Sequence, residues 1–175
     1  MTDRCENQEY EMAAAQNGHN LAQYPITEQL VLGSQPGPTD WAKLANSGFD
    51  TVLNIRQDPQ KAGVQAKLAE AVGLKYIHLP LPAYELDPEH VTQFNQVISN
   101  PKNGKVLFHC RSASRTGLLW MLKRTEHDGW TLEQAEAELR AAGYDDDNIG
   151  VFEFCADDYF ERAIAPELQL AAPLS

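Results

Sequence analysis

The sequence predicts a single α/β domain, with a mostly parallel central sheet of about four to five strands flanked by helices. Two observations favour this class. The chain has 175 residues, a length that suits one domain with one sizeable hydrophobic core. Short apolar runs of strand type alternate along the chain with longer segments of helical periodicity, and this alternation is typical of a parallel sheet covered by helices.

Four apolar runs are the predicted strands, and turn residues or a helix start bound each of them. They cover residues 30–34, 49–55, 75–79 and 105–108. The last run leads directly into His109 and Cys110. In folds of this class, ligands gather beyond the carboxyl ends of the strands, which is where Cys110 is expected to lie.

Helical patterns lie between and after these runs. Asp87 is a predicted N-cap with Pro88 in the first helical position, and Thr131 to Gln134 form a capping-box signature. The predicted helices cover about residues 39–45, 61–72, 88–98, 115–128, 132–142 and 151–164.

The two ends of the chain differ from the middle in composition. Residues 1–24 are polar without sustained periodicity and are predicted to be a mobile tail. The folded domain is expected over 25–165, followed by a loose C-terminal tail over 166–175.

Charge and hydropathy restrict the partners and the compartment. A formal net charge of -11 disfavours nucleic acid and anionic membrane surfaces as partners. No apolar run approaches the ~20 residues that span a bilayer. The first residues have neither the basic region nor the apolar segment of a secretory signal. We therefore expect a cytoplasmic protein.

The cysteines give no sign of a metal site. Cys5, Cys110 and Cys155 are widely spaced, without a Cys-x-x-Cys pair or zinc spacing. Three consecutive aspartates at 145–147 have too few ligand partners nearby and are expected to form a solvated turn. We expect reduced thiols, no metal and no cofactor.

The segment from Val106 to Trp120 carries the predicted chemistry. An apolar strand leads to Cys110, a loop of small and basic residues follows, and the pattern turns helical after Gly117. Backbone N–H groups converge at such a turn, and the helix dipole is positive there. Both effects favour a thiolate, as do the two arginines of the loop. The construction predicts a nucleophilic sulfur facing an oxyanion.

Each residue of this loop has a predicted role. Cys110 is the expected nucleophile, and the planar fork of Arg115 can hold two oxygens of a tetrahedral oxyanion. The amides of residues 111–115 would bind the other oxygens. Thr116 can donate its hydroxyl to the sulfur of Cys110 and ease its departure. Arg56, at the end of the second predicted strand, either adds positive charge to this site or forms a surface ion pair. The alternative for Cys110 is a small buried hydrophobic residue.

The loop resembles a known family. His109-Cys110-Arg111-Ser112-Ala113-Ser114-Arg115-Thr116-Gly117 is similar to the phosphate loop of the Cys-dependent protein phosphatase superfamily, and more closely to that of the bacterial beta-lactamase hydrolase-like phosphatase group. The resemblance covers about residues 26–142. It implies a fold like that of protein tyrosine and dual-specificity phosphatases. It also implies a catalytic domain that hydrolyses phosphate monoesters through a cysteinyl-phosphate intermediate.

The loop departs from the larger superfamily in two ways. Four residues separate Cys110 from Arg115, where typical members have five, and four is also the spacing of rhodanese-type sulfurtransferases. Ala113 stands in the usual glycine position. If this position needs a positive φ, alanine costs ~1 kcal/mol there.

The general acid is open. The family's aspartate position falls near Ala83 and Tyr84, neither of which can serve. Glu85 and Asp87 are the main candidates and His90 is a weaker one, and helix capping is the competing role for Asp87. General acid catalysis contributes ~10²–10⁴ in rate, so a chain without it would be a slow phosphatase.

Three functions follow. The first is a phosphatase acting on a phosphorylated protein or a small phosphate ester, with no cofactor. The second is a sulfurtransferase with a persulfide on Cys110, which needs no general acid. The third is a non-catalytic module that binds a phosphorylated partner. The loop spacing and the open general acid favour the second, whereas the overall resemblance, His109 before the cysteine and the Arg-Thr-Gly ending favour the first, which we rank narrowly ahead.

Overall fold

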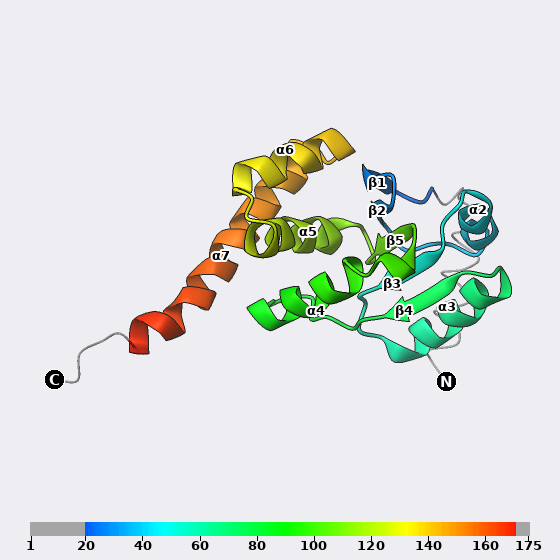
Figure 1. Cartoon of the computed structure of the whole chain (residues 1–175), viewed down its shortest axis with the longest axis horizontal. Coiled ribbons are helices and arrows are strands. Elements are labelled where there is room, and N and C mark those ends of the chain that lie inside the picture. The colour runs from blue at the N-terminus through cyan, green and yellow to red at the C-terminus, as the bar shows by residue number, and fades with distance from the viewer. Residues whose placement is uncertain (1–19, 171–175) are drawn as a thin grey trace.

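The described part of the chain is built on one five-stranded sheet (Figure 1). The computed structural model describes residues 20–170, with the side chains of 20–164. The strands are β1 (Gln23–Thr27), β2 (Leu30–Gly33), β3 (Thr51–Asn54), β4 (Lys75–His78) and β5 (Val106–His109). They lie in the order β1-β2-β5-β3-β4, where β1 is antiparallel to β2 and all other neighbours are parallel. The predicted mostly parallel α/β sheet is therefore confirmed.

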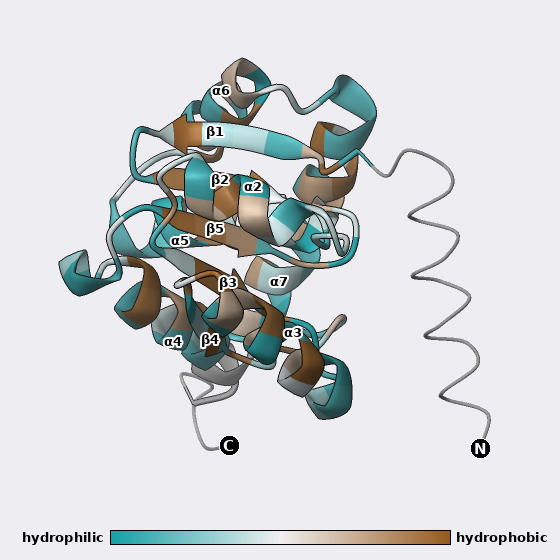
Figure 2. Cartoon of the chain, turned by 90° about the vertical axis from the view of Figure 1, so that its right-hand side faces the viewer, coloured by the Kyte–Doolittle hydropathy of each residue, from teal (hydrophilic) through white to brown (hydrophobic). Residues whose placement is uncertain are grey.

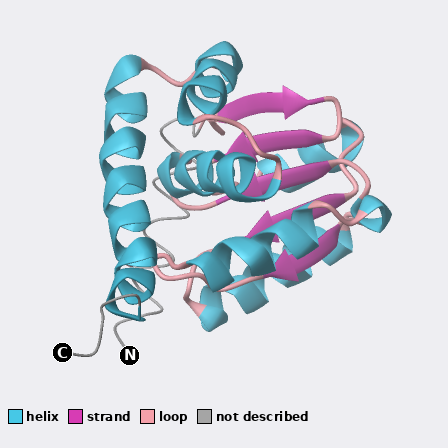
Figure 3. Ribbon diagram, turned by 60° about the vertical axis from the view of Figure 1, so that its left-hand side comes forward, coloured by secondary structure: helices cyan, strands magenta, loops and turns pink. Residues whose placement is uncertain are grey.

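Helices cover both faces of this sheet (Figure 3). They are α2 (Asp40–Asn46), α3 (Pro59–Ala71), α4 (Pro88–Ile98), α5 (Ser114–His127), α6 (Leu132–Ala142) and α7 (Asp146–Leu170), together with the 3-10 turn η1 (Pro101–Asn103). Side chains of α2 and α3 pack in one core cluster with β2, β3 and β5, and those of α4 to α7 pack in a larger cluster on the other face. Figure 2 shows the hydrophobic strands enclosed between these layers.

Most predicted elements are confirmed. The four predicted strands and the first five predicted helices each lie within two residues of their expected bounds. Both predicted caps form, since the side chain of Asp87 accepts the N–H of His90 and Thr131 makes a full capping box. No helix within residues 20–170 is both long and apolar enough to cross a membrane.

The two domain ends need correction. β1 begins at Gln23, so the predicted boundary after residue 24 cuts through a strand. Pro25 cannot donate to a strand ladder and is tolerated because β1 is an edge strand. At the other end α7 runs from Asp146 to Leu170, so residues 166–170 are helical and not part of a loose tail. Residues 1–19 and 171–175 of the predicted tails lie outside the described residues.

The topology brings four loops to one edge of the sheet. β2, β5, β3 and β4 are mutually parallel, so their carboxyl ends meet there. β5 lies between β2 and β3, and its loop therefore lies between the loops that follow those two strands. We call residues 110–115, which follow β5 and include the first two residues of α5, the Cys loop. Successive residues of β5 face opposite sides, so that Leu107 packs toward α2 and α3 while Phe108 packs toward α4 and α5.

Candidate active site

Cys110 lies at the base of the Cys loop. It is a free cysteine, 1% exposed, and it packs with the larger core cluster. Such burial is also what the alternative of a small hydrophobic residue predicts. The role of Cys110 therefore has to be judged from the groups around the sulfur.

Two carbonyls of the Cys loop are bound from outside the loop. The Nδ1 atom of His109 lies 3.0 Å from the carbonyl oxygen of Cys110, and the N–H of Gln35 donates to the carbonyl of Arg111 at 3.1 Å. In a trans peptide the N–H points away from the preceding carbonyl. The N–H groups of Arg111 and Ser112 therefore point away from these outer partners, as an anion-binding loop requires.

A third carbonyl, that of Ala113, is held most firmly. It accepts the hydroxyl of Tyr144 at 2.7 Å and the hydroxyl of Thr116 at 2.8 Å. The N–H of Ser114 consequently points away from the buried Tyr144. The predicted bond from Thr116 to the sulfur is not formed, because this hydroxyl donates to the Ala113 carbonyl instead.

Ala113 adopts the positive φ that makes an alanine costly at this position. Its φ is 68°, in the left-handed region, and the residue is fully buried. A left-handed alanine costs ~1 kcal/mol, which the two hydroxyl bonds to its carbonyl offset. The strain is therefore real, and the loop keeps its shape without the glycine.

Tyr144 is a site residue that the sequence did not reveal. Its ring stacks on Tyr24 of β1 with centroids 3.9 Å apart and meets Phe152 of α7 edge-on. Burial raises the pKa of Tyr144, the nearby Cys110 adds to the rise, and the hydrogen bond with Thr116 opposes it. The hydroxyl therefore stays protonated and remains a donor beneath the Cys loop.

Replacing Tyr144 by phenylalanine should misalign the Ser114 N–H. We expect the free energy of unfolding to fall by about 1 kcal/mol and kcat/KM for an aryl phosphate to fall roughly tenfold. Denaturant titration and steady-state kinetics measure the two effects. The matched control is Tyr159→Phe on α7, whose hydroxyl donates to Glu126 at 2.6 Å. That variant should lose stability alone, and an equal loss of activity in both would contradict a positioning role for Tyr144.

His109 packs beneath the loop on the α2–α3 side. It is fully buried, and its Nε2 atom has no hydrogen-bond partner among the described residues. Burial lowers the pKa of His109 to about 4, helped by the charges of Arg56 and His78 and opposed by the bond to the Cys110 carbonyl. The ring is thus neutral near pH 7. Since a carbonyl only accepts, its proton is on Nδ1.

Arg115 and Arg56, two of the arginines predicted to bind substrate, donate hydrogen bonds to uncharged groups. Arg115 donates to the carbonyl of Leu81, in the loop after β4, at 3.4 Å. Arg56, after β3, donates to the side chain of Gln35 at 2.8 Å. The structure therefore brings Arg56 to the Cys loop through Gln35, whose N–H binds the Arg111 carbonyl.

Ion pairing separates the arginines of this chain into two groups. Among the six that the structure describes, those on the outer helices each pair with a carboxylate: Arg124, Arg140 and Arg162. Within the same residues no ion pair is formed by the three at the site: Arg56, Arg111 and Arg115. On a chain of net charge -11, unpaired arginines gathered at one loop make a local attraction for an anion.

The loop residues Ser112 and Ser114 complete the rim. Ser112 is exposed, Ser114 is half-buried, and their hydroxyls lie 3.3 Å apart. Ser112 also forms an isolated bridge with Ser34, which fixes the Cys loop against the loop after β2. Both hydroxyls are available as additional donors to an oxyanion.

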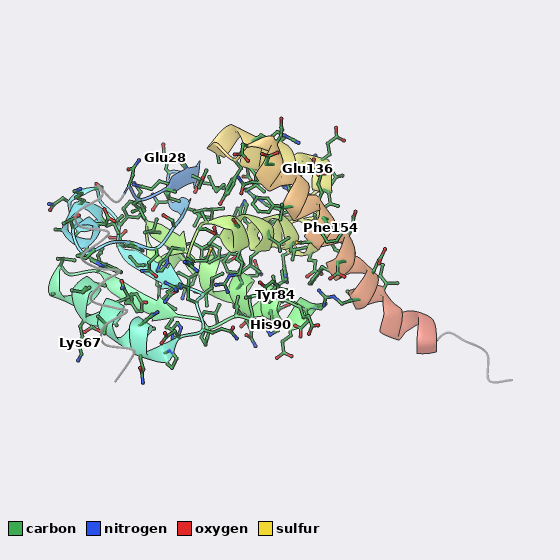
Figure 4. The ribbon with its side chains drawn as sticks, turned by 180° about the vertical axis from the view of Figure 1, so that it is seen from behind. Glu28, Lys67, Tyr84, His90, Glu136 and Phe154 are labelled. Carbon is green, nitrogen blue, oxygen red and sulfur yellow. The ribbon has the colours of Figure 1, made fainter. Side chains whose placement is uncertain are left out.

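The candidate acids lie in the loop between β4 and α4, the loop that Arg115 contacts. The Oδ1 atom of Asp87 accepts the N–H of His90 at 3.0 Å, so its carboxylate caps α4. Glu85 is exposed and has a φ of 58°; with Ala113 it forms the only non-glycine pair of positive φ within the described residues. Tyr84, 84% exposed, projects from the same loop just before His90 and α4 (Figure 4).

The fold and the loop together define a class: a Cys-loop domain of the phosphatase-like α/β kind. The chain belongs to the family described as "Beta-lactamase hydrolase-like protein, phosphatase-like domain", whose model matches residues 23–127. A beta-lactamase hydrolase-like protein of Xylella fastidiosa is 28% identical over 125 residues, which is 69% of this chain and 29% of that protein. The chain thus spans under a third of the length of this curated relative.

Solved structures support the fold. TpbA of P. aeruginosa matches with a TM-score of 0.62 at 24% identity, covering 85% of this chain and 89% of TpbA. The core catalytic domain of the PP-IP phosphatase SIW14 from S. cerevisiae matches with a TM-score of 0.57 at 19% identity, covering 87% and 95%. The fold is therefore that of protein tyrosine phosphatase-like enzymes.

Proposed function

We propose that this chain is a Cys-dependent phosphatase that hydrolyses phosphate monoesters through a cysteinyl-phosphate intermediate. The observation that carries the proposal is the Cys loop itself. Three of its carbonyls are bound from outside, at Cys110, Arg111 and Ala113, which turns the following N–H groups away from those partners. Unpaired arginines surround the same loop. A purely structural cysteine at a strand end requires neither feature.

The reaction uses the groups in sequence. The phosphate binds to the loop N–H groups, and Arg115 exchanges the carbonyl of Leu81 for two phosphate oxygens. The thiolate of Cys110 attacks phosphorus, so that an S–P bond forms while the ester P–O bond breaks. Glu85 gives its proton to the leaving oxygen. Water then attacks phosphorus and gives a proton to the Glu85 carboxylate while the S–P bond breaks, so that inorganic phosphate leaves with the thiolate and the acid both restored. A reducing cytoplasm would keep Cys110 out of disulfides and so available for this reaction.

Glu85 is the better acid candidate because the Asp87 carboxylate already caps α4, and because strained backbone is often retained at functional sites. Glu85→Gln should lower kcat for an alkyl phosphate by ~10²–10⁴ and remove the basic limb of its pH–rate profile. The loss should be much smaller for an aryl phosphate with a good leaving group. Asp87→Asn, which keeps a good N-cap, is the matched control. Wild-type profiles in both variants would exclude both residues.

The substrate class is a phosphorylated protein or a small phosphate ester. One structure of TpbA is a complex with pTyr, and SIW14 is a PP-IP phosphatase, so proteins of this fold are found with different kinds of phosphate compound. The exposed Tyr84, which precedes Glu85 in the loop between β4 and α4, offers an aromatic surface to either substrate.

A sulfurtransferase remains the second candidate, because the four-residue spacing from Cys110 to Arg115 is that of rhodanese-type loops. A paired assay tests both candidates on the wild-type chain. Phosphate release from phenyl phosphate is measured beside thiocyanate formation from thiosulfate and cyanide. We expect the first activity, with a phosphorylated peptide containing Cys110 in a quenched sample. Thiocyanate formation alone would replace the proposal, and neither activity would favour a non-catalytic phosphate-binding module.

A further inference from the structure

Arg56 is held beside the Cys loop by a hydrogen bond to Gln35 that passes the carboxyl end of β5. It follows β3, whereas its partner Gln35 follows β2, and β5 lies between these two strands. To reach Gln35, the guanidinium therefore passes the carboxyl end of β5, where the Cys loop begins. The N–H of Gln35 binds the carbonyl of Arg111 at 3.1 Å. The charge of Arg56 is thus fixed next to the first residues of the loop.

Further hydrogen bonds hold the backbone of Arg56 in this position. The backbone N–H of Arg56 donates to the side chain of Asn54 at 2.8 Å, and the amide of Asn54 donates to the hydroxyl of Tyr76 at 2.9 Å. The carbonyl of Arg56 contacts the ring of His78. None of these contacts is to a carboxylate, so Arg56 is oriented without forming an ion pair.

The alternative of a surface ion pair does not describe Arg56. No carboxylate of the described residues lies within ion-pair distance of it. The nearest acidic residue along the chain, Asp58, caps α3 through Gln60 and Lys61 and pairs with the Lys61 ammonium at 3.9 Å. The charge of Arg56 also reaches the buried His109, whose pKa it helps to lower. An uncompensated cation at this place has a use if an anion binds there.

We infer that Arg56 is a specificity residue for a second phosphate group on the substrate. The substrate class is then a small molecule carrying two phosphate groups close together. The inference rests on the proposed function: the loop N–H groups and Arg115 hold the phosphate that is transferred, and Arg56 with the exposed Arg111 holds its neighbour.

The test compares two substrates that share an aryl leaving group. Phenyl phosphate carries one phosphate, and benzene-1,3-diyl bisphosphate carries two. The readout is the ratio of kcat/KM for the bisphosphate to that for the monophosphate. Arg56→Gln should lower this ratio about tenfold, the usual effect of losing one charge-assisted contact, and mainly through KM. The control is Arg140→Gln on α6, which removes the same charge from an arginine paired with Glu136 and Asp146.

The outcomes separate specificity from structure. If Arg56→Gln lowers both kcat/KM values equally, Arg56 only supports the loop and the inference is overturned. An unchanged ratio, or an equal change in Arg140→Gln, overturns it as well. In each of these cases the proposed phosphatase activity still stands, because phenyl phosphate is turned over.

A binding measurement decides the case in which no hydrolysis is found and the proposed function itself fails. Pyrophosphate and inorganic phosphate are titrated into Cys110→Ser by calorimetry. Pyrophosphate should bind more tightly than phosphate. Adding Arg56→Gln should lower the affinity for pyrophosphate about tenfold and leave the affinity for phosphate unchanged. Equal affinities in the parent, or equal losses for the two anions, would overturn the second-phosphate site.

Discussion

Cys110→Ser is expected to lose phosphate release by at least about three orders of magnitude, because removing a nucleophile abolishes the covalent route. A serine hydroxyl in the same position is a far weaker nucleophile than the sulfur, so the covalent intermediate should not form. The anion site remains, since its carbonyl anchors and arginines do not involve the sulfur. The variant should therefore still bind inorganic phosphate, as calorimetry can measure.

The chain offers a matched control for this variant. Cys155 on α7 is the other free cysteine of the described residues and is half-buried. Burial and the nearby Asp158 raise the pKa of the Cys155 thiol, the opposite of what a nucleophile needs. Cys155→Ser should keep wild-type turnover. Phosphatase activity surviving in Cys110→Ser would exclude Cys110 as the nucleophile, and full loss of phosphate binding would exclude the loop as an anion site.

The four parallel strands and the order of the helices could be predicted because the sequence signals for them are local. Apolar runs, the Asp87 cap and the Thr131 capping box each act within a few residues. β1 escaped prediction because Pro25 interrupts a pattern in which only Tyr24 and Ile26 are apolar, and because its pairing with β2 depends on a position at the sheet edge. The extent of α7 likewise depends on packing against α5 and α6.

The candidate site likewise has parts that the local sequence predicts and parts that depend on long-range contacts. Its nucleophile loop is one continuous segment, and the left-handed Ala113 follows from the position that glycine usually takes. Tyr144 lies 31 residues after Ala113, and no motif links them. The contact arises because α7 brings Phe152 against Tyr144 and against Gly117, where an added Cβ would come within 2.5 Å of the Phe152 ring. The Ala113 carbonyl also accepts the hydroxyl of Thr116 at 2.8 Å, so that Tyr144 and Thr116 share one acceptor.

His109 gives this site a dependence on pH that can be measured as stability. In the folded chain its pKa is about 4, against an ordinary value of 6.5, because protonation would put a charge into the protein interior, near Arg56. The unfolded chain therefore binds a proton at a higher pH than the folded chain. The free energy of unfolding should fall as the pH decreases from about 6.5 to about 4, by about 3 kcal/mol in full. Below about pH 4 the contribution of this residue no longer changes.

A variant isolates this contribution from those of the carboxylates. His109→Gln removes the titrating ring, so the wild type should lose about 3 kcal/mol more than the variant between pH 7.5 and pH 4. Urea titrations at a series of pH values measure the difference, and a constant offset from the altered packing does not affect its slope. Parallel curves for the two proteins would mean that His109 titrates normally.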